Sequence, residues 1–126
     1  IAELITRQGG FALDERKIEI RNGKPVRDFI YVGDLVAGIG KCLDSDYKGI
    51  LNLTSREGKS IEELALNIAG LTGIPLEEVY CGQGEYEYIV GENARAEKII
   101  GWQPKTSLEE GLKKTVEFYK QNLKDY

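Results

Sequence analysis

Segment 27–36, with the sequence RDFIYVGDLV, changes from a strand pattern to a helix pattern within a few residues. Phe29, Tyr31 and Val32 are aromatic or β-branched residues, which favour a pleated and half-buried strand. Asp34 follows at once, and its carboxylate suits a helix N-terminus because it accepts hydrogen bonds from free backbone N–H groups. A chain that makes this switch must combine strands with helices, so the segment predicts a mixed α/β fold.

Arg27 opens this segment with a planar, permanently charged guanidinium, which suits a phosphate or a carboxylate. One interpretation is an anion-binding site at the mouth of the strand-to-helix switch. The other is a structural ion pair, for example with Asp28. Residue chemistry alone favours the ion pair, because phosphate sites usually contain more glycine and more cations.

The composition is that of a single globular domain over residues 1–126, with 41% hydrophobic and 30% charged residues. The net charge of −4, with both signs interspersed, argues against a nucleic-acid partner and against an anionic membrane surface. No apolar run approaches the roughly 20 residues that span a bilayer. We therefore expect neither nucleic acid nor a membrane as a partner.

Two cysteines and the absence of histidine restrict the chemistry further. Cys42 and Cys81 are too few for a disulfide framework or a zinc set, and buried thiols fit a reducing, cytoplasmic setting. Histidine is the commonest general base and the commonest metal ligand. Its absence argues against a metal site and leaves a Ser or Cys nucleophile without its usual base.

Alternating and helical patterns predict the other elements. Residues 17–20 alternate like a half-buried strand, and the turn pair Asn22-Gly23 then predicts a hairpin-like unit over 17–32 with Arg27 near its turn. Further strands are expected at 50–54 and 86–90. Helices are expected at 1–8, at 34–43, from Ser60 to Gly73, from Glu92 or Asn93 to Gly101, and from Ser107 to Leu123.

Local signals mark several helix ends. Two capping boxes place Glu three residues after an N-cap Ser, at Ser60/Glu63 and Ser107/Glu110. Gly73 is expected to end one helix. Trp102 follows another helix and is expected to fold back onto the core. Within the helix at 34–43, the residues expected to face inward are Leu35, Val36, Ile39 and Leu43.

Signatures of self-sufficient catalysis are missing from the sequence. Gly82-Gln83-Gly84 forms only the first half of a dinucleotide-binding fingerprint, and no P-loop is present. No tyrosine is followed four positions later by lysine, and no serine lies in a nucleophile elbow. Composition and spacing alone therefore predict a small binding or structural domain.

Several segments, taken in order, resemble one family. Their sequence is similar to the C-terminal part of the extended short-chain dehydrogenase/reductases that act on nucleotide sugars, a group of 4-epimerases and 4,6-dehydratases. The resemblance implies an α+β substrate domain, with helices packed on short strands and no Rossmann domain in this chain. The matching segments are IxI at 18–20 with Gly23, RDFIYVxD at 27–34, GxxNL at 49–53, SxxELA at 60–65, RA at 95–96, GWxPK at 101–105 and SLEEGL at 107–112.

The resemblance also implies a division of labour. In this family an N-terminal Rossmann domain binds NAD(P) and carries the catalytic Tyr-x-x-x-Lys, while the smaller part closes over the nucleotide sugar. The chain begins at Ile1 and not at methionine, so we expect a fragment or a trimmed chain whose upstream part supplies those elements. By this resemblance the parent protein is an enzyme, whereas this chain has no catalytic residue and binds no cofactor itself.

The resemblance assigns roles to three residues. Arg27 matches the arginine that contacts the substrate diphosphate, and a guanidinium can bind it through two hydrogen bonds. Ile20 matches a strand end that lies against the nucleotide base. Arg21 stands where relatives usually have glycine, and it is a candidate to replace a second phosphate-binding arginine. The loop at 81–85 lacks that second arginine and instead contains Glu85, which would repel a diphosphate.

Two functional readings follow. In the first, the chain holds a nucleotide diphosphate sugar, packs against the Rossmann domain of its parent, and exposes an apolar face where that domain is removed. Self-association through that face, as a homodimer, is an option. In the second, a free-standing domain of the same fold has lost catalysis and binds a ligand or a protein partner.

Overall fold

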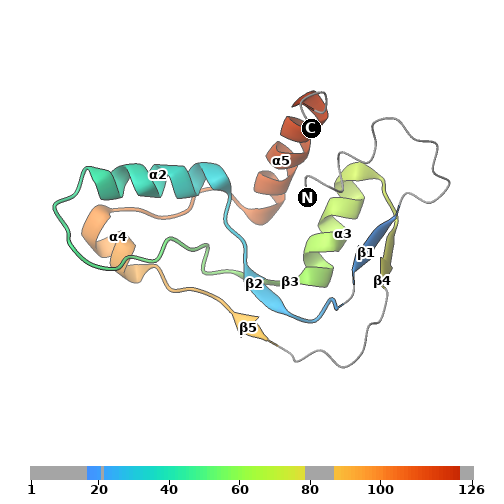
Figure 1. Cartoon of the computed structure of the whole chain (residues 1–126), viewed down its shortest axis with the longest axis horizontal. Coiled ribbons are helices and arrows are strands. Elements are labelled where there is room, and N and C mark those ends of the chain that lie inside the picture. The colour runs from blue at the N-terminus through green and yellow to red at the C-terminus, as the bar shows by residue number, and fades with distance from the viewer. Residues whose placement is uncertain (1–16, 21, 79–86, 123–126) are drawn as a thin grey trace.

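The computed structural model describes residues 17–20, 22–78 and 87–122 and has mixed α/β architecture, as predicted (Figure 1). The helix predicted at 1–8 lies outside these residues. The strands are β1 (Ile18–Ile20), β2 (Val26–Asp28), β3 (Gly58–Ser60), β4 (Leu76–Glu78) and β5 (Tyr88–Ile89). The helices are α2 (Val32–Leu43), α3 (Ile61–Thr72), α4 (Ala94–Ile100) and α5 (Leu108–Asn122).

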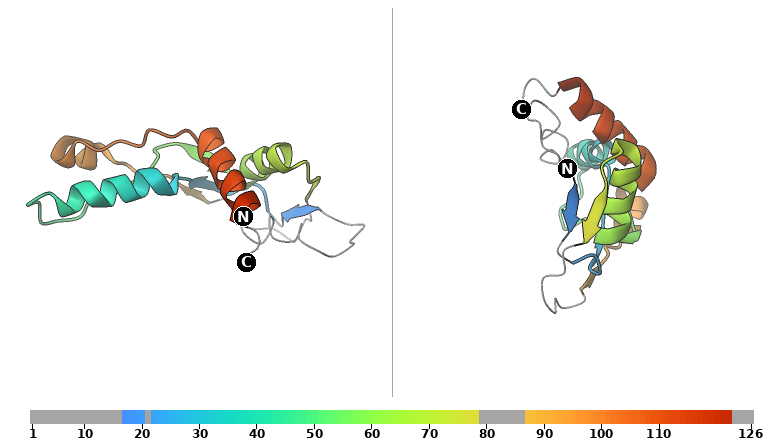
Figure 2. Two further views of the ribbon diagram at one scale, coloured as in Figure 1. Left: turned by 90° about the horizontal axis from the view of Figure 1, so that it is seen from above. Right: turned by 90° about the vertical axis from the view of Figure 1, so that its right-hand side faces the viewer.

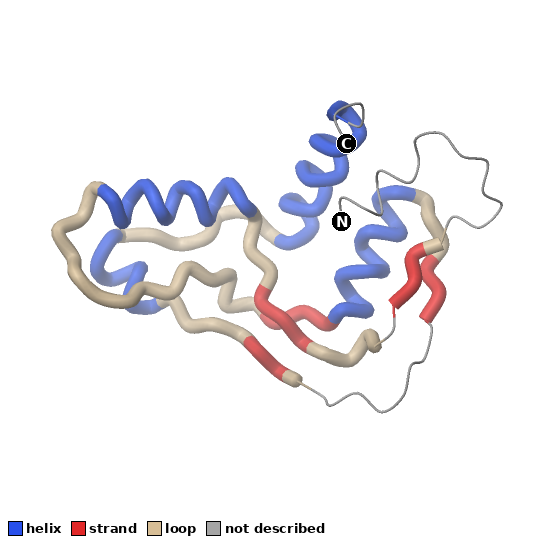
Figure 3. Tube along the Cα trace, in the orientation of Figure 1, coloured by secondary structure: helices blue, strands red, loops and turns tan. Residues whose placement is uncertain are grey.

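The described strands form two small sheets, drawn in red in Figure 3. One pairs β1 with β4 in parallel. The other has the order β3-β2-β5, so β2 is its central strand, antiparallel to β3 and parallel to β5. This central position places every side chain of β2 between two neighbouring strands.

The predicted hairpin over 17–32 is wrong, because β1 and β2 belong to different sheets. The turn region between them is used for another purpose. Carbonyl oxygens of Gly23 and Pro25 accept hydrogen bonds from the backbone N–H groups of Glu62 and Ile61, at 3.1 and 3.0 Å. The turn thus satisfies free donors at the start of α3, and β1 is left to pair with β4.

The buried core joins β1, α3 and α5, and Figure 2 shows α3 alongside β1 and β4. Apolar stripes on the two helices meet the alternating isoleucines of the strand, which is how short elements bury a common face. The core residues are Ile18, Ile20, Ala65, Ile68, Ile74 and Leu112.

The α3 capping box is confirmed. Glu63 N donates to Ser60 Oγ at 3.0 Å, and Ser60 N donates to Glu63 Oε2 at 2.8 Å. Gly73 ends the helix in the left-handed region at φ 72°, as predicted. At α5 only half of the box is observed: Glu110 N donates to Ser107 Oγ at 3.2 Å, while the Glu110 carboxylate pairs with a lysine.

The strand predicted through Val32 ends at Asp28, and α2 begins at Val32, two residues before the expected Asp34. The segment at 50–54, predicted as a strand, is irregular. Residue propensity could not predict where the first strand ends or that 50–54 is irregular, because a strand persists only where a neighbouring strand pairs with it. Strand β5 pairs only with Val26 and Arg27 of β2, so it does not extend the pairing beyond Asp28.

Helix α2 packs through a different face from the predicted one. Its buried residue is Gly38, where an added Cβ would lie 2.9 Å from side-chain atoms of Leu53 and Trp102. Trp102 is buried, as predicted, and its indole N–H donates to the Asp34 carbonyl at 3.0 Å. Of the residues expected to face inward, Leu35 is half-buried, whereas Val36, Ile39 and Leu43 are exposed, with Val36 at 60% and Leu43 at 82%.

Candidate functional site

Arg27 lies at the middle of the central strand. It is directly opposite Lys59 of antiparallel β3 and opposite Ile89 of parallel β5. Side chains alternate between the two faces of a strand, so the flanking Val26 and Asp28 point to the other face. The guanidinium therefore stands on one face of a three-stranded sheet, with 30% of the side chain exposed.

A carboxylate holds this guanidinium. Arg27 Nη2 lies 2.5 Å from Glu87 Oε2, and Nη1 donates to the carbonyl oxygens of Glu87 and Val26 at 3.0 and 2.9 Å. The ion pair that residue chemistry favoured is therefore present, but its acid is Glu87 and not Asp28. The partner comes from a distant part of the chain, which sequence spacing gave no means to anticipate.

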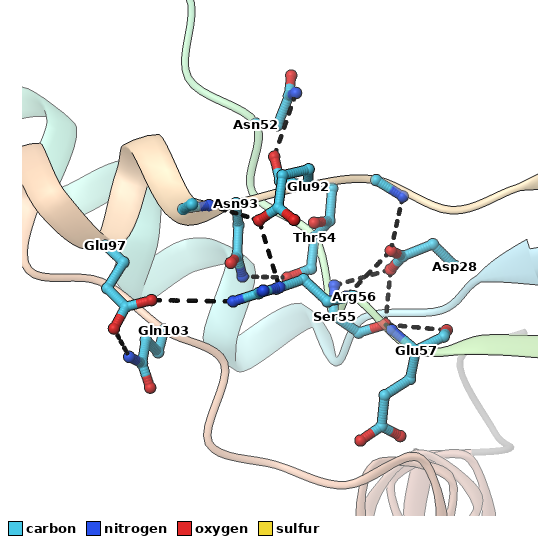
Figure 4. A network of polar contacts seen from close by, with 12 residues as sticks. Asp28, Asn52, Thr54, Ser55, Arg56, Glu57, Glu92, Asn93, Glu97 and Gln103 are labelled. Carbon is cyan, nitrogen blue, oxygen red and sulfur yellow. Dashed lines mark hydrogen bonds and ion pairs between the residues drawn. The ribbon is translucent and has the colours of Figure 1, made fainter.

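Asp28 is the hub of a separate polar network (Figure 4). Its carboxylate accepts hydrogen bonds from Ser55 N and Ser55 Oγ, both at 2.7 Å, and from the backbone N–H groups of Arg56 and Gly91 at 3.1 Å. Arg56 adopts the left-handed region at φ 65°, where a non-glycine residue needs such support. Asp28 thereby fixes two loops to the strand that carries Arg27.

The Asp34 carboxylate links α2 to the segment before α5 and does not cap its own helix. Its carboxylate accepts hydrogen bonds from the backbone N–H groups of Lys105 and Thr106 at 3.1 and 2.8 Å. Burial raises the pKa of this carboxyl, but the hydrogen bonds from Thr106 and Lys105 outweigh it and place the pKa below the ordinary value of 3.8. Tyr31 occupies the N-cap position of α2, without a side-chain hydrogen bond.

The other two predicted site residues are Ile20 and Arg21. The side chain of Ile20 is 9% exposed and packs in the core with Ala65 and Ile68 of α3. Arg21 lies outside the described residues. The structure therefore brings Arg27 to a reachable sheet face but does not bring the Ile20 side chain there.

Lys59 is a residue that the sequence did not single out. It lies opposite Arg27, and its side chain is 39% exposed. Together with Phe29, Lys105 and the network residues Ser55 and Arg56, it lines a pocket of about 520 Å³. No motif marks this lysine, since only the β2–β3 register places it beside Arg27.

Within residues 17–20, 22–78 and 87–122, no group of three or more metal-ligating side chains is positioned to hold a metal ion. None of the helices in this described part is long and apolar enough to cross a membrane. Cys42 is a free, half-buried thiol, and Cys81 lies outside the described residues.

Known proteins share this architecture. A UDP-glucose 4-epimerase from Mycolicibacterium smegmatis is 32% identical over 102 residues, which cover 79% of this chain and 33% of that protein. The structure of UDP-glucose 4-epimerase from Thermotoga maritima with UDP-glucose matches 97% of this chain and 38% of that one, with a TM-score of 0.78 and 27% identity. Bordetella bronchiseptica WbmF, in complex with NAD+ and UDP, matches 84% of this chain and 32% of its own, with a TM-score of 0.73 and 30% identity.

The chain therefore spans about a third of the length of these relatives. The model of the GDP-mannose 4,6 dehydratase family matches residues 3–115, which is most of the sequence. Ordered motifs, fold and relatives agree. The chain belongs to this family of the extended short-chain dehydrogenase/reductases.

Proposed function

We propose that this chain is the substrate-binding part of an NAD(P)-dependent nucleotide-sugar epimerase or dehydratase, and that Arg27 binds the substrate diphosphate. The observation that carries the proposal is the partly exposed guanidinium on the central strand of a sheet. Its adjacent residue, Asp28, is tied to two loops by four hydrogen bonds, which fixes the strand that presents it. Relatives solved with UDP-glucose or UDP support this ligand class.

Binding requires an exchange at Arg27. The Glu87 carboxylate is paired with the guanidinium. A diphosphate carries more negative charge and more acceptor oxygens than a carboxylate, so it can replace Glu87. Because both side chains are partly exposed, the ion pair to be broken is weak, and the exchange costs little.

The neighbouring candidates take lesser roles in this proposal. The Ile20 side chain is committed to the core, so a nucleotide base would contact the end of β1 through its backbone. Arg21 follows directly and is a candidate for a second phosphate contact. Neither residue supplies an acid or a base, and the chain therefore positions the substrate without performing the chemistry.

The cofactor and the catalytic Tyr-x-x-x-Lys belong to a Rossmann domain outside this chain. The exposed apolar stripe of α2, formed by Val32, Val36, Ile39 and Leu43, is the surface on which we place that domain. Apolar stripes of this kind on a helix normally pack against another element. A second copy of the chain is the other candidate to cover it.

Titration of the full-length protein with UDP tests the proposal. Arg27→Ala is expected to weaken UDP binding by about 1.5–3 kcal/mol, because a charge-assisted hydrogen bond is lost. Arg95→Ala, which removes an exposed guanidinium from α4, serves as the matched control and is expected to leave the Kd unchanged. An unchanged Kd in the Arg27 variant would remove the diphosphate role.

A free-standing, non-catalytic domain is the second candidate function. It is favoured by one observation, namely that Arg27 is paired with the Glu87 carboxylate of the same chain. The sequence of the full-length protein discriminates between the two. A glycine-rich βαβ unit and Tyr-x-x-x-Lys upstream of Ile1 support the enzyme, whereas a start codon next to Ile1 supports the binding domain.

A further inference from the structure

Lys59 and Arg27 are two cations directly opposite each other in antiparallel strands. Residues in this relation project from the same face of a sheet, with Cβ atoms about 4.5–5.5 Å apart. We propose that Lys59 is a second phosphate-binding residue that acts with Arg27 on one nucleoside diphosphate. This inference rests on the proposed function above and adds to it a residue that no sequence motif marks.

The parallel pairing of β2 with β5 identifies the face independently. Ile89 lies opposite Arg27, and Glu87 precedes it by two residues, so Glu87 points to the face that carries Arg27. The observed contact of Arg27 with Glu87 agrees with this assignment. Lys59, Arg27 and Glu87 therefore share one face, while the Asp28 network belongs to the other.

The two cations on this face differ in how closely a carboxylate holds them. Like charges directly opposite each other destabilise a strand pair, and an anion between them removes that repulsion. Arg27 has a close partner in Glu87, whereas Lys59 Nζ lies 3.9 Å from Glu63. The Glu63 carboxylate also accepts a hydrogen bond from Ser60 N at 2.8 Å as part of the capping box. Lys59 is therefore the more loosely held of the two cations.

Space and reach suit the proposed ligand. Both cationic side chains are partly exposed, at 30% and 39%. Lys59 lines a pocket of about 520 Å³ together with Phe29, Lys105 and the network residues Ser55 and Arg56, and Arg27 lies outside this lining. A lysine ammonium has three donors on a flexible stem and can reach a phosphoryl group adjacent to the one bound by Arg27.

The experiment compares UDP with uridine in the full-length protein by titration calorimetry. Lys59→Gln is expected to weaken UDP binding about three- to tenfold and to leave uridine binding unchanged, because only the phosphates meet the lysine. Lys59→Arg should restore UDP binding. Lys98→Gln removes an exposed lysine from α4 and controls for the change in net charge. Arg27→Ala and Arg21→Gln complete the set.

Each result bears on the proposal. Loss of UDP affinity in the Arg27 and Lys59 variants, with uridine unaffected, supports both the proposed function and the second cation. If Arg27→Ala loses UDP affinity and Lys59→Gln does not, the role of Lys59 is overturned while that of Arg27 stands. The same holds if Arg21→Gln, and not Lys59→Gln, loses UDP affinity. Equal losses for UDP and uridine in Lys59→Gln also overturn it, since they indicate a structural role. No UDP binding by the unaltered protein overturns both proposals.

Discussion

Adjacent residues of β2 have opposite tasks. Arg27 projects to a face with 30% of its side chain exposed, whereas Asp28 accepts four hydrogen bonds from two loops on the other face. The alternation of a strand separates the binding group from its support. A substitution at either position should therefore change a different property of the protein.

Asp28→Ala is expected to lower the free energy of unfolding by about 1.5–3 kcal/mol, because the backbone donors of Arg56 and Gly91 lose a charged acceptor. Urea denaturation of the full-length protein measures this loss. Asp46→Ala, at an exposed position in the loop after α2, is the control and should have little effect. Equal stabilities for the two variants would contradict the role assigned to the network.

Glu87→Gln tests the exchange at Arg27. Removal of the competing carboxylate charge should tighten UDP binding by up to about fivefold, which is the modest change expected of a partly exposed ion pair. Calorimetry measures the Kd, and Glu117→Gln, an exposed position on α5, controls for net charge. Weaker binding in Glu87→Gln would mean that the carboxylate orients Arg27 and does not compete with the ligand.

Asp34 gives a prediction about acid stability. Its folded-state pKa lies below the ordinary value of 3.8, so its ionised form stabilises the fold above that pH. This contribution is lost as the pH falls through the folded-state pKa. Thermal melts of Asp34→Asn should therefore fall less steeply with acidification than those of the unaltered protein, with Asp46→Asn as the control. If the melting temperatures of Asp34→Asn and Asp46→Asn fell with pH at the same rate, Asp34 would not have this role.

At the scale of elements, the two Ser-capped helices allow a direct comparison. Ser60→Ala removes a cap whose reciprocal hydrogen bond is present, whereas Ser107→Ala removes a cap that makes a single hydrogen bond. We expect the first change to cost about 1 kcal/mol of unfolding free energy and the second to cost less. Chemical denaturation measures both. A larger effect at Ser107 would show that the reciprocal bond adds nothing.

At the scale of the whole molecule, the elements lie in an extended arrangement with α2 and α4 at one end and α3, β1 and β4 at the other (Figures 1 and 2). In this extended arrangement, the apolar stripe of α2 is exposed, with Val32 at 62% and Leu43 at 82% exposure. Contiguous apolar surface of this kind is normally covered. Since α2 buries its glycine face against Trp102, the stripe remains available to a partner.

The 126-residue chain is therefore expected to self-associate through α2 when no other domain covers it. The double change Val36→Asp and Ile39→Asp should shift the chain toward the monomer in sedimentation experiments, because it places two charges on the stripe. Ala37→Asp adds a charge at another exposed position of α2 and should change the association less. A monomer at all concentrations before any substitution would argue against this face as an interface.

Features that depend on residues close in the chain were predictable. The Ser60/Glu63 box and the left-handed Gly73 follow from interactions within a few positions, and both were found as predicted. Trp102 is also buried as predicted, although its contacts with α2 join distant parts of the chain. The ordered series of motifs, which includes the Arg27 segment, also identified the family. The boundaries at Asp28 and Val32 were not predictable, since strand propensity continues through Tyr31 and only the lack of a pairing partner ends the strand.

By itself, the sequence determined the mixed fold, the helix caps and the presence of a guanidinium at the strand-to-helix switch. Only the tertiary structure decided what surrounds that guanidinium: Glu87 as its acid, Lys59 as its neighbour, and Asp28 as the support behind it. Helix caps form between residues three or four positions apart. Strand register and cross-sheet ion pairs instead join segments separated by long stretches of chain, and the pairing of the whole sheet sets them.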